Sequence, residues 1–317
     1  MKKISWLLLA VLLLSLAAPA LAEWTPEKPV IIMNYVKAGG GMDISTRKFA
    51  ELAAKYTDAT IVVDNKPGSN GMIAADYLLE QPADGYNVFA STIAYVDNIL
   101  IAEEDTEKYI WSFEWIDNIM ADPFAIIVAK DNNITLDEVI ADAKVNRQKW
   151  LGPSGAKNIV AIQFWNAFGM EADWVTYESG PDALIAVMGG QGIASVGNPG
   201  DVEGRDLKNL VIATETKLPK HPDVLNFAEL GYPELDQLSM WRGFAVKKGT
   251  PPEMIAWWQD LCQKVTEDPE WIQFFSDKSI VVHNITTEEF TQQVKNDIES
   301  HLQIMKDADI VDASYGG

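Results

Sequence analysis

Short apolar runs alternate with helical patterns along the first third of the chain. Residues 29–33 form an apolar run suited to a buried strand, and residues 44–56, after a glycine loop, place apolar positions at helical spacing. Further strands are expected at 61–63 and 86–91, with a helix through 74–81 between them. Because strands and helices alternate, we expect a mostly parallel sheet with crossover helices.

The same order begins again in the middle of the chain, which indicates a second α/β unit. Its expected strands lie at 124–129, 150–151, 173–176, 192–196 and 210–213, and its expected helices at 136–146, 159–168 and 182–188. The pattern then returns to helices, at 252–267, 270–277 and 287–308. No long linker separates the units, so we predict a shared interface with crossing strands. One domain is expected to comprise residues 23–124 and 244–317, and the other residues 125–243.

The N-terminal residues have the layout of a secretory signal. Lys2 and Lys3 precede an almost wholly apolar run over residues 6–18, and Ala20 and Ala22 stand where a signal peptidase reads small residues. The run is shorter than the roughly 20 residues that a membrane span needs, and an uncleaved anchor is the alternative. We predict that residues 1–22 are a signal peptide and that the mature protein is periplasmic, with no direct membrane insertion.

Acidic residues outnumber basic ones. Lys and Arg total 25 and Asp and Glu total 46, so the net charge is −21, or −23 without Lys2 and Lys3. This charge repels nucleic acid and anionic membranes, but the field inside a pocket comes from nearby dipoles and cations. The acids are dispersed, as on a solvated surface. The single cysteine, Cys262, excludes an intrachain disulfide and is expected to be a buried core residue.

The first candidate binding feature is the loop AGGGMD at residues 38–43. Glycines let the backbone approach a ligand closely, and the helix that follows presents unpaired amides and a partial positive charge, with Asp43 as the expected N-cap. This geometry suits a carboxylate or a phosphate, and a tight turn without a ligand is the alternative. The loop lacks the endings of a Walker loop and of a dinucleotide fingerprint.

A second loop, GPSGAKN at residues 152–158, also joins a strand to a helix. It offers a hydroxyl at Ser154, a cation at Lys157 and an amide at Asn158. A secreted hydrolase using Ser154 is an alternative function, which needs a histidine within hydrogen-bond reach. The nucleophile-elbow spacing is not matched, because Gly155 follows Ser154 directly. The candidate bases are His221, His283 and His301, which we expect to be solvated.

A third feature is Trp241 beside Arg242, on a strand that is expected to join the two units. The ring and the guanidinium suit stacking on, and pairing with, an anionic ligand. The alternative is a tryptophan packed in the interface and an arginine on the surface. The sequence contains no H-E-x-x-H motif, cysteine pair or calcium-loop spacing, so we predict neither a metal nor a cofactor.

Taken together, these loops resemble the substrate-binding receptors of tripartite tricarboxylate transporters. The matching stretches are EKPV at 27–30, AGGGMD at 38–43, VVDNKPGSNG at 62–71, ADGY at 83–86, TYESGPDAL at 176–184, GGQ at 189–191, PKHPDVLNFAELGYP at 219–233 and KGTPPEMI at 248–255. Their order and spacing over the mature chain make the match specific. The resemblance implies an α/β periplasmic binding protein with two domains, of the flytrap type and type II-like. Two crossing hinge strands join its domains, and the protein closes around a small carboxylate.

The chain departs from the family pattern at several positions of the pocket. Tyr35-Val36 replaces Pro-Phe, Pro153 and Lys157 replace Ser and Gly, Asn158 replaces Ser or Thr, Gly197-Asn198 replaces an Asp-containing pair, and Arg242 replaces an aromatic or aliphatic residue. The pocket has therefore lost an acid and gained two cations. We hypothesise that Lys157 and Arg242 bind a second carboxylate, so that the ligand is a dicarboxylate or a larger acidic compound, such as an aromatic acid.

The resemblance and these departures together predict the site. The expected ligand-binding residues are Tyr35, Gly39, Gly40, Gly41, Asp43, Ser91, Thr92, Ser154, Gly155, Lys157, Asn158, Tyr177, Asn198, Trp241 and Arg242. Asp43 is expected to fix its loop rather than to touch an anion. The resemblance implies a monomeric binding protein, not an enzyme, whose partners are a small organic acid and membrane transporter subunits. A periplasmic sensor subunit that docks on a receptor kinase is the alternative.

Overall fold

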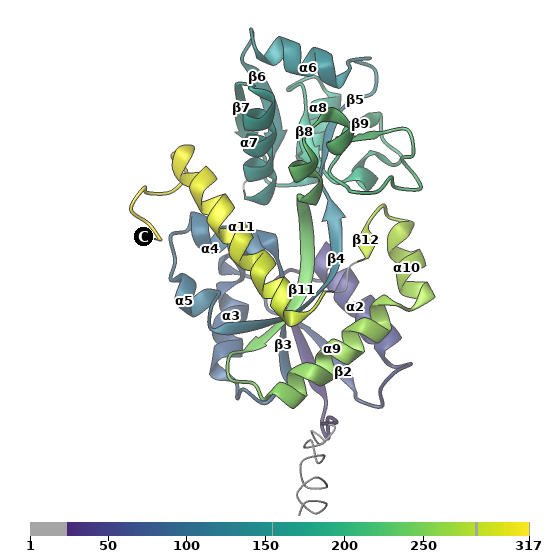
Figure 1. Cartoon of the computed structure of the whole chain (residues 1–317), viewed down its shortest axis with the longest axis vertical. Helices are drawn as coiled ribbons and strands as arrows, with labels where there is room; N and C mark the ends of the chain where they lie inside the picture. Colours follow the sequence, from purple (N-terminus) through teal and green to yellow (C-terminus); the bar gives the residue numbers. More distant parts are fainter. Residues whose placement is uncertain (1–23, 154, 283–284, 317) are drawn as a thin grey trace, which may run out of the picture.

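The computed structural model describes residues 24–153, 155–282 and 285–316. The molecule has two lobes along its longest axis, and two strand segments run between them (Figure 1). One segment is β4 (Phe113–Pro123), which leads directly into β5 (Ala125–Ala129). The other is β11 (Ser239–Lys247), which pairs antiparallel with β4. The crossing strands therefore form the connection about which the lobes can move.

The first lobe is built on a six-stranded sheet in the order β12-β4-β11-β3-β1-β2. Its other strands are β1 (Val30–Asn34), β2 (Ile61–Asn65), β3 (Asn87–Thr92) and β12 (Val281–Val282). Its helices are α2 (Gly41–Ala53), α3 (Met72–Glu80), α4 (Ile93–Ile101), α5 (Thr106–Tyr109), α9 (Pro252–Thr266), α10 (Pro269–Ser276) and α11 (Thr287–Asp307). Both β2 and β3 pair parallel with β1, so α2 and α3 are crossover helices.

The second lobe carries a four-stranded sheet in the order β10-β9-β5-β8 and the parallel pair β6-β7. A single bridge between Trp150 and Ala194 links the pair to the larger sheet. The strands are β6 (Gln148–Gly152), β7 (Ala172–Thr176), β8 (Ser195–Gly197), β9 (Leu207–Ile212) and β10 (Leu225–Asn226), and the helices are α6 (Leu136–Ala143), α7 (Ala156–Phe168) and α8 (Gly180–Met188). Helix α7 also contacts α4 and α11 of the first lobe.

The prediction of a mostly parallel sheet is confirmed for β1, β2 and β3 but is wrong for the rest of the sheet. Strand β11 pairs antiparallel with β3 and β4, and β5 pairs antiparallel with β8 and β9. The pattern misled because β4 carries Glu114, Asp117 and Asp122 among apolar residues, so neither strand nor helix periodicity is clear there. Helix α7 begins at Ala156, before its predicted start at 159. The division of the chain into domains at the predicted residues stays a prediction.

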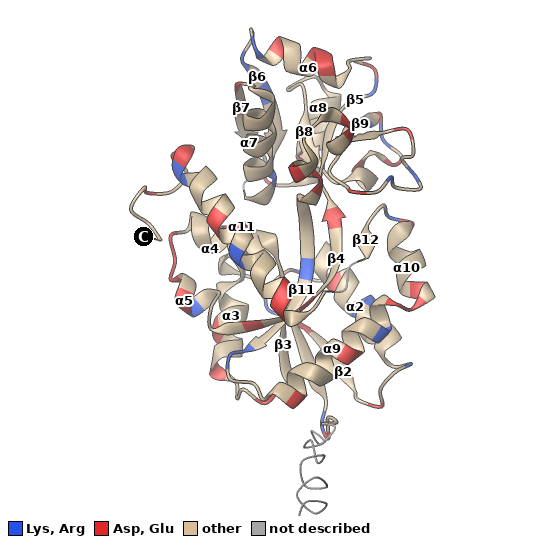
Figure 2. Ribbon diagram, in the orientation of Figure 1, with Lys and Arg blue, Asp and Glu red and all other residues tan. Residues whose placement is uncertain are grey.

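Two predictions about composition are confirmed. Asp and Glu are spread over both lobes rather than gathered in one patch (Figure 2). The Cys262 side chain is fully buried in α9, and burial raises the pKa of its thiol well above the usual value. Cys262 is therefore a core residue with no nucleophilic character.

Candidate ligand-binding site

The glycine loop of the first lobe lies at the start of α2. Gly40 is the N-cap and has no side chain to offer, so the prediction that Asp43 is the N-cap is wrong. Asp43 lies inside the first turn, where its carboxylate accepts hydrogen bonds from the Gly39 amide at 2.8 Å and from Arg47 Nε at 3.0 Å. As expected, it fixes the loop. The first amides of α2 are left without a side-chain cap and can donate hydrogen bonds to an anion.

The charge of Asp43 is kept by its partners. Burial raises the pKa of this carboxyl group, but the hydrogen bonds from Arg47 and from the Gly39 amide outweigh burial and hold the pKa below its ordinary value. Gly39 itself has a φ of +83°, a conformation that side chains other than glycine rarely adopt. The loop is thus held in shape by its own residues.

Arg242 lies directly against this loop. A Cβ atom on Gly41 would come within 2.9 Å of Arg242 Nη2, so a side chain there would require the guanidinium to shift. Arg242 donates to Asp122 at 3.3 Å, and both side chains are only 12% exposed. The pair uses one nitrogen of the guanidinium, which leaves further donors for a ligand.

Asp122, the partner of Arg242, was not predicted from the sequence. Burial raises the pKa of Asp122, and the charges of Arg242 and Lys157 oppose that rise. Its carboxylate therefore lies within electrostatic range of a cation from each loop. The available signal was a lone acid within the apolar run of residues 119–129, since an acid is rarely buried without a partner.

Tyr35, Ser91 and Thr92 lie at the ends of β1 and β3, on the same side of the first lobe as Arg242. The Tyr35 hydroxyl and Thr92 Oγ1 are 2.6 Å apart, and Arg242 is opposite Thr92 in the β11–β3 register. Burial raises the pKa of Tyr35 to about 12, so this hydroxyl is neutral and can donate or accept a hydrogen bond. Ser91 is fully buried, and its hydroxyl has no hydrogen-bond partner among the described residues.

The second loop lies at the start of α7, and Ser154 falls outside the described residues. Gly155 has a φ of +92°, and a Cβ atom on it would lie 3.8 Å from Asn98 Oδ1, so this loop reaches α4 of the first lobe. Lys157 is in the first turn of α7 and is 3.6 Å from Asp201. The Asn158 Oδ1 atom is buried and has no hydrogen-bond partner among the described residues.

Tyr177 and Asn198 flank this loop. The Tyr177 amide donates to the Gly152 carbonyl at 2.8 Å, and its hydroxyl donates to Gln191 at 2.9 Å. The side-chain nitrogen of Asn198, Nδ2, donates to the Pro123 carbonyl at 3.1 Å, which ties the second lobe to a crossing strand. Asn198 also lines a cavity of about 220 Å³ together with Asp122, Gly200, Asp201, Glu203 and Lys278.

Trp241 lies on the other side of β11 from Arg242. Its ring is buried and makes edge contacts with Trp115 and Phe290, and its indole N–H donates to Asp297 at 2.8 Å. The structure therefore does not bring Trp241 together with Arg242. One half of the alternative, a packed tryptophan, fits the structure, but the other half does not, because the Arg242 side chain is only 12% exposed and does not lie on the surface.

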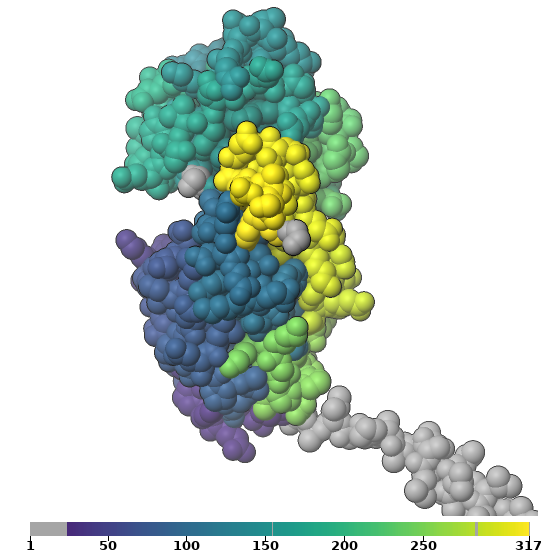
Figure 3. All heavy atoms as spheres, turned by 90° about the vertical axis from the view of Figure 1, so that its left-hand side faces the viewer, coloured from purple at the N-terminus to yellow at the C-terminus, as the bar shows by residue number. Residues whose placement is uncertain are grey.

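The space-filling view shows a hollow between the second lobe and the purple and blue part of the first (Figure 3). The start of α2 with Arg242 and the start of α7 with Lys157 belong to the two lobes that border it, and Asp122 lies near both cations. We call this region the interlobe cleft. The described residues hold no group of His, Cys, Asp or Glu suited to a metal ion.

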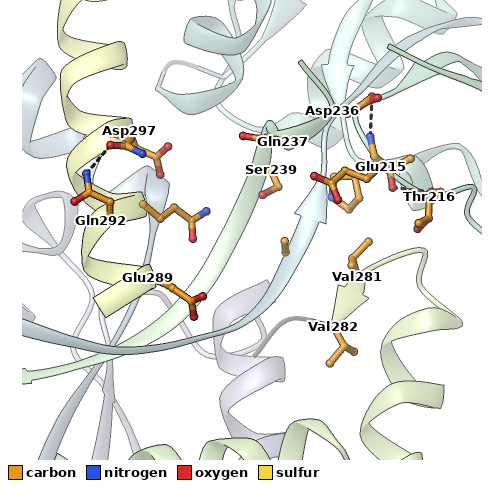
Figure 4. A pocket seen from close by; sticks show the side chains of 16 residues that line it. Glu215, Thr216, Asp236, Gln237, Ser239, Val281, Val282, Glu289, Gln292 and Asp297 are labelled. Carbon is orange, nitrogen blue, oxygen red and sulfur yellow. Dashed lines mark hydrogen bonds between the residues drawn. The ribbon is translucent and has the colours of Figure 1, made fainter. Parts of the chain in front are cut away.

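A larger cavity of about 720 Å³ lies between β11, β12 and α11, and we call it the rear groove (Figure 4). The acids Glu215, Asp236, Glu289 and Asp297 line it, and no Lys or Arg is among its described lining residues. Asp236 accepts backbone hydrogen bonds, and Glu289 caps α11. An anion would meet only negative charge there, so a carboxylate is expected in the interlobe cleft.

Comparisons with known proteins place these features in a family. Residues 45–310 match the model of the tripartite tricarboxylate transporter family receptor. The chain belongs to this family. A UPF0065 protein of Cupriavidus necator is 24% identical over 306 residues, 93% of this chain and 91% of the relative. A UPF0065 protein of Bordetella bronchiseptica is 28% identical over 277 residues, 83% of this chain and 81% of the relative.

Solved structures of the family share the fold. A TctC solute-binding protein from Polaromonas has a TM-score of 0.77 at 22% identity, with 90% of this chain and all of that chain covered. Two Rhodopseudomonas palustris proteins were solved with bound carboxylates. MatC with malate has a TM-score of 0.70 at 18% identity, and the match covers 88% of this chain and 99% of that chain. A protein with adipate has a TM-score of 0.72 at 19% identity, and the match covers 90% of this chain and 98% of that chain.

These comparisons confirm the family and the fold class, a two-domain α/β periplasmic binding protein. The family consists of receptors that work with a transporter, not of enzymes, and its members are periplasmic. Among the described residues, no helix has the length and apolar character of a membrane span. The predicted signal peptide, residues 1–22, and the proposed nucleophile Ser154 lie outside the described residues.

Proposed function

We propose that this protein is an extracytoplasmic receptor that captures a small carboxylate and delivers it to a tripartite tricarboxylate-type transporter. One observation carries the proposal. The uncapped start of α2 with Arg242 and the start of α7 with Lys157 come from different lobes, and both cations act on Asp122. Helix amides and cations are the groups that proteins use to hold carboxylates.

The position of these groups supports a closing mechanism. A carboxylate bound at the start of α2 satisfies the amides of Gly41, Met42 and Asp43, which belong to the first lobe only. A ligand that also reaches Gly155 or Asn158 gains contacts from the second lobe, and those contacts exist only when the cleft is narrow. Ligand binding therefore favours the closed form, through movement about the crossing strands. No covalent step or cofactor is required.

The relatives support the class of ligand. The R. palustris proteins that share the fold carry malate and adipate, both of which are small carboxylates. The rear groove offers only acids to such a ligand, whereas the interlobe cleft offers Arg242 and Lys157. The electrostatic difference favours the cleft.

Thermal unfolding of the mature chain against a panel of carboxylates tests the proposal. A ligand at about 100 times its Kd stabilises the folded state by roughly 2.7 kcal/mol, which shifts Tm by several degrees. Each carboxylate is paired with its uncharged amide, such as adipate with adipamide. We expect shifts from one or more acids and from none of the amides. Equal shifts from an acid and its amide, or no shift from any acid, would contradict carboxylate recognition.

A further inference from the structure

The ammonium group of Lys157 is placed where its own surroundings disfavour it. Lys157 is the second residue of α7, and that first turn contains no acid. The start of a helix carries a partial positive charge, which repels a cation. A Cβ atom on Gly180 would lie 3.6 Å from Lys157 Nζ, so the ammonium also lies beside the start of α8. The start of α7, which has no acid in its first turn, thus repels this half-buried cation, whereas the start of α8 carries Asp182 in its first turn.

The protein gives this cation only a weak partner. Asp201 is 3.6 Å from Lys157 Nζ, which is longer than a hydrogen bond, while the Lys157 side chain is 14% exposed. The Asp201 carboxylate already accepts a hydrogen bond from the backbone N–H of Asn198 at 2.9 Å. In the part of the chain that the structure describes, no acceptor forms a hydrogen bond with Lys157 Nζ. A buried ammonium with no hydrogen bond is costly, and an entering anion would relieve that cost.

Arg242 is in a different state. It already has a buried partner in Asp122 at 3.3 Å, and it lies against Gly41 of the first loop. Asp122 is also close enough to Lys157 for that charge to oppose the rise of its pKa. The charges of both cations therefore act on one carboxylate, and Arg242 lies beside the first loop while Lys157 belongs to the second. They are placed to hold two separate anionic groups.

We propose that Lys157 is a specificity-determining residue that selects ligands with a second carboxylate. One carboxylate binds the start of α2 together with Arg242. The other binds Lys157, the amides that begin α7 and the side chain of Asn158. This inference rests on the proposed function, since it concerns the same cleft.

Calorimetric titration with matched acids tests the inference. Succinate is compared with butyrate, adipate with hexanoate, and suberate with octanoate. In the wild-type protein we expect one diacid to bind at least about tenfold more tightly than its monoacid, because a charge-assisted hydrogen bond contributes that much or more. In Lys157→Gln the diacid should lose roughly 10- to 100-fold in affinity, while the monoacid should keep its affinity within about twofold.

Two further variants separate recognition from folding. Asp201→Asn removes the competing charge, so we expect tighter binding of the diacid. Lys149→Gln changes an exposed lysine of β6 and should bind both acids like the wild type. Equal losses for monoacid and diacid in Lys157→Gln, or a wild-type protein that binds monoacids and diacids alike, would overturn the role of Lys157 and leave the proposed function intact. If no acid of either kind binds, both proposals fail.

Discussion

The two glycine loops of the cleft differ in how their shape is maintained. In the first loop, Asp43 holds the Gly39 amide and Arg47, and Arg242 beside it is paired with Asp122. In the second loop, the first turn of α7 has no acid, and Lys157 has only the distant Asp201. The first loop is therefore held by its own residues, whereas the second contains a cation without a hydrogen bond among the described residues. We predict from this contrast that a ligand binds first to the first lobe and then brings the second lobe onto it.

Arg242→Met should give the largest effect, since it breaks the charge pair of the first loop. Removing one partner of a buried ion pair costs about 3 kcal/mol of stability, partly offset here because burial allows Asp122 to take up a proton. Binding of carboxylates should also weaken roughly 10- to 100-fold. Urea unfolding and calorimetric titration measure the two effects separately.

The double variant Asp122→Leu with Arg242→Met is the matched control for this prediction. Replacing both charges by apolar groups removes the unpaired carboxyl, so stability should return close to that of the wild type. Carboxylate binding should remain weak, because the guanidinium is still missing. A double variant that regains binding along with stability would show that Arg242 acts through folding and not through contact with the ligand.

Gly152→Ala should have the next largest effect, and it acts on the second loop. A Cβ atom at this position would lie 2.4 Å from Trp174 Cζ2, which is a steric clash. The Trp174 ring or the strand must move to relieve it. Overpacking of this kind costs about 2 kcal/mol. Urea unfolding measures the loss, and adding Trp174→Leu should recover part of it by opening space. No change in stability in the single variant would mean that the second loop adjusts freely.

Gly39→Ala changes the first loop without a steric clash, because no atom lies within 4 Å of the added Cβ. The cost comes only from the φ of +83° and should be about 1 kcal/mol. Affinity for a monocarboxylate should also fall, since the Gly39 amide holds Asp43 and so helps to position the free amides of α2 that are expected to contact the ligand. Equal affinity in wild type and variant, by calorimetry, would remove Gly39 from the proposed site.

The loops could be predicted from sequence because their signals are local. A glycine run between a strand and a helix identifies residues 39–41, and GPSGAKN identifies the second loop. The partners of these loops come from long-range pairing. Arg242 reaches Gly41 because β11 pairs with β3, and the pattern of residues 239–247 does not contain that register.

The error about Trp241 could have been avoided from the sequence alone. Successive residues of a strand point to opposite faces, so Trp241 and Arg242 on β11 are not expected to face the same ligand. The strand was expected, and applying this rule would have left one of the two residues for the core. Asp122 was missed for the opposite reason. Its only signal was a charge in an apolar run, and its partner is 120 positions away.

The behaviour of the protein with pH sharpens the contrast, because buried titratable groups lie next to Trp241, on the opposite side of β11 from Arg242. Trp241, next to Arg242, donates to Asp297, and His301 Nδ1 is 2.6 Å from Asp97. Burial lowers the pKa of His301, but Asp97 and then Asp297 outweigh burial and raise it above its usual value. Burial likewise raises the pKa of Asp297 to about 6, against the charge of His301.

Both shifts predict that stability falls as the pH rises. A histidine with a raised folded pKa stabilises the protein fully below its unfolded value of about 6.5, and this contribution is lost as the pH rises through the folded pKa. Asp297 loses its contribution between about pH 4 and pH 6, where the unfolded chain has already released that proton.

Urea unfolding from about pH 5 to pH 8 measures this effect. Above about pH 6.5, the free energy of unfolding should fall less steeply with pH in His301→Gln than in the wild type. The preference for diacids over monoacids, which we assign to Lys157, should change least above about pH 6.5, where both carboxyl groups of the diacids are ionised. A His301→Gln variant with the wild-type slope would place the pH response elsewhere, and a diacid preference that follows the slope would tie the second loop to the same buried groups.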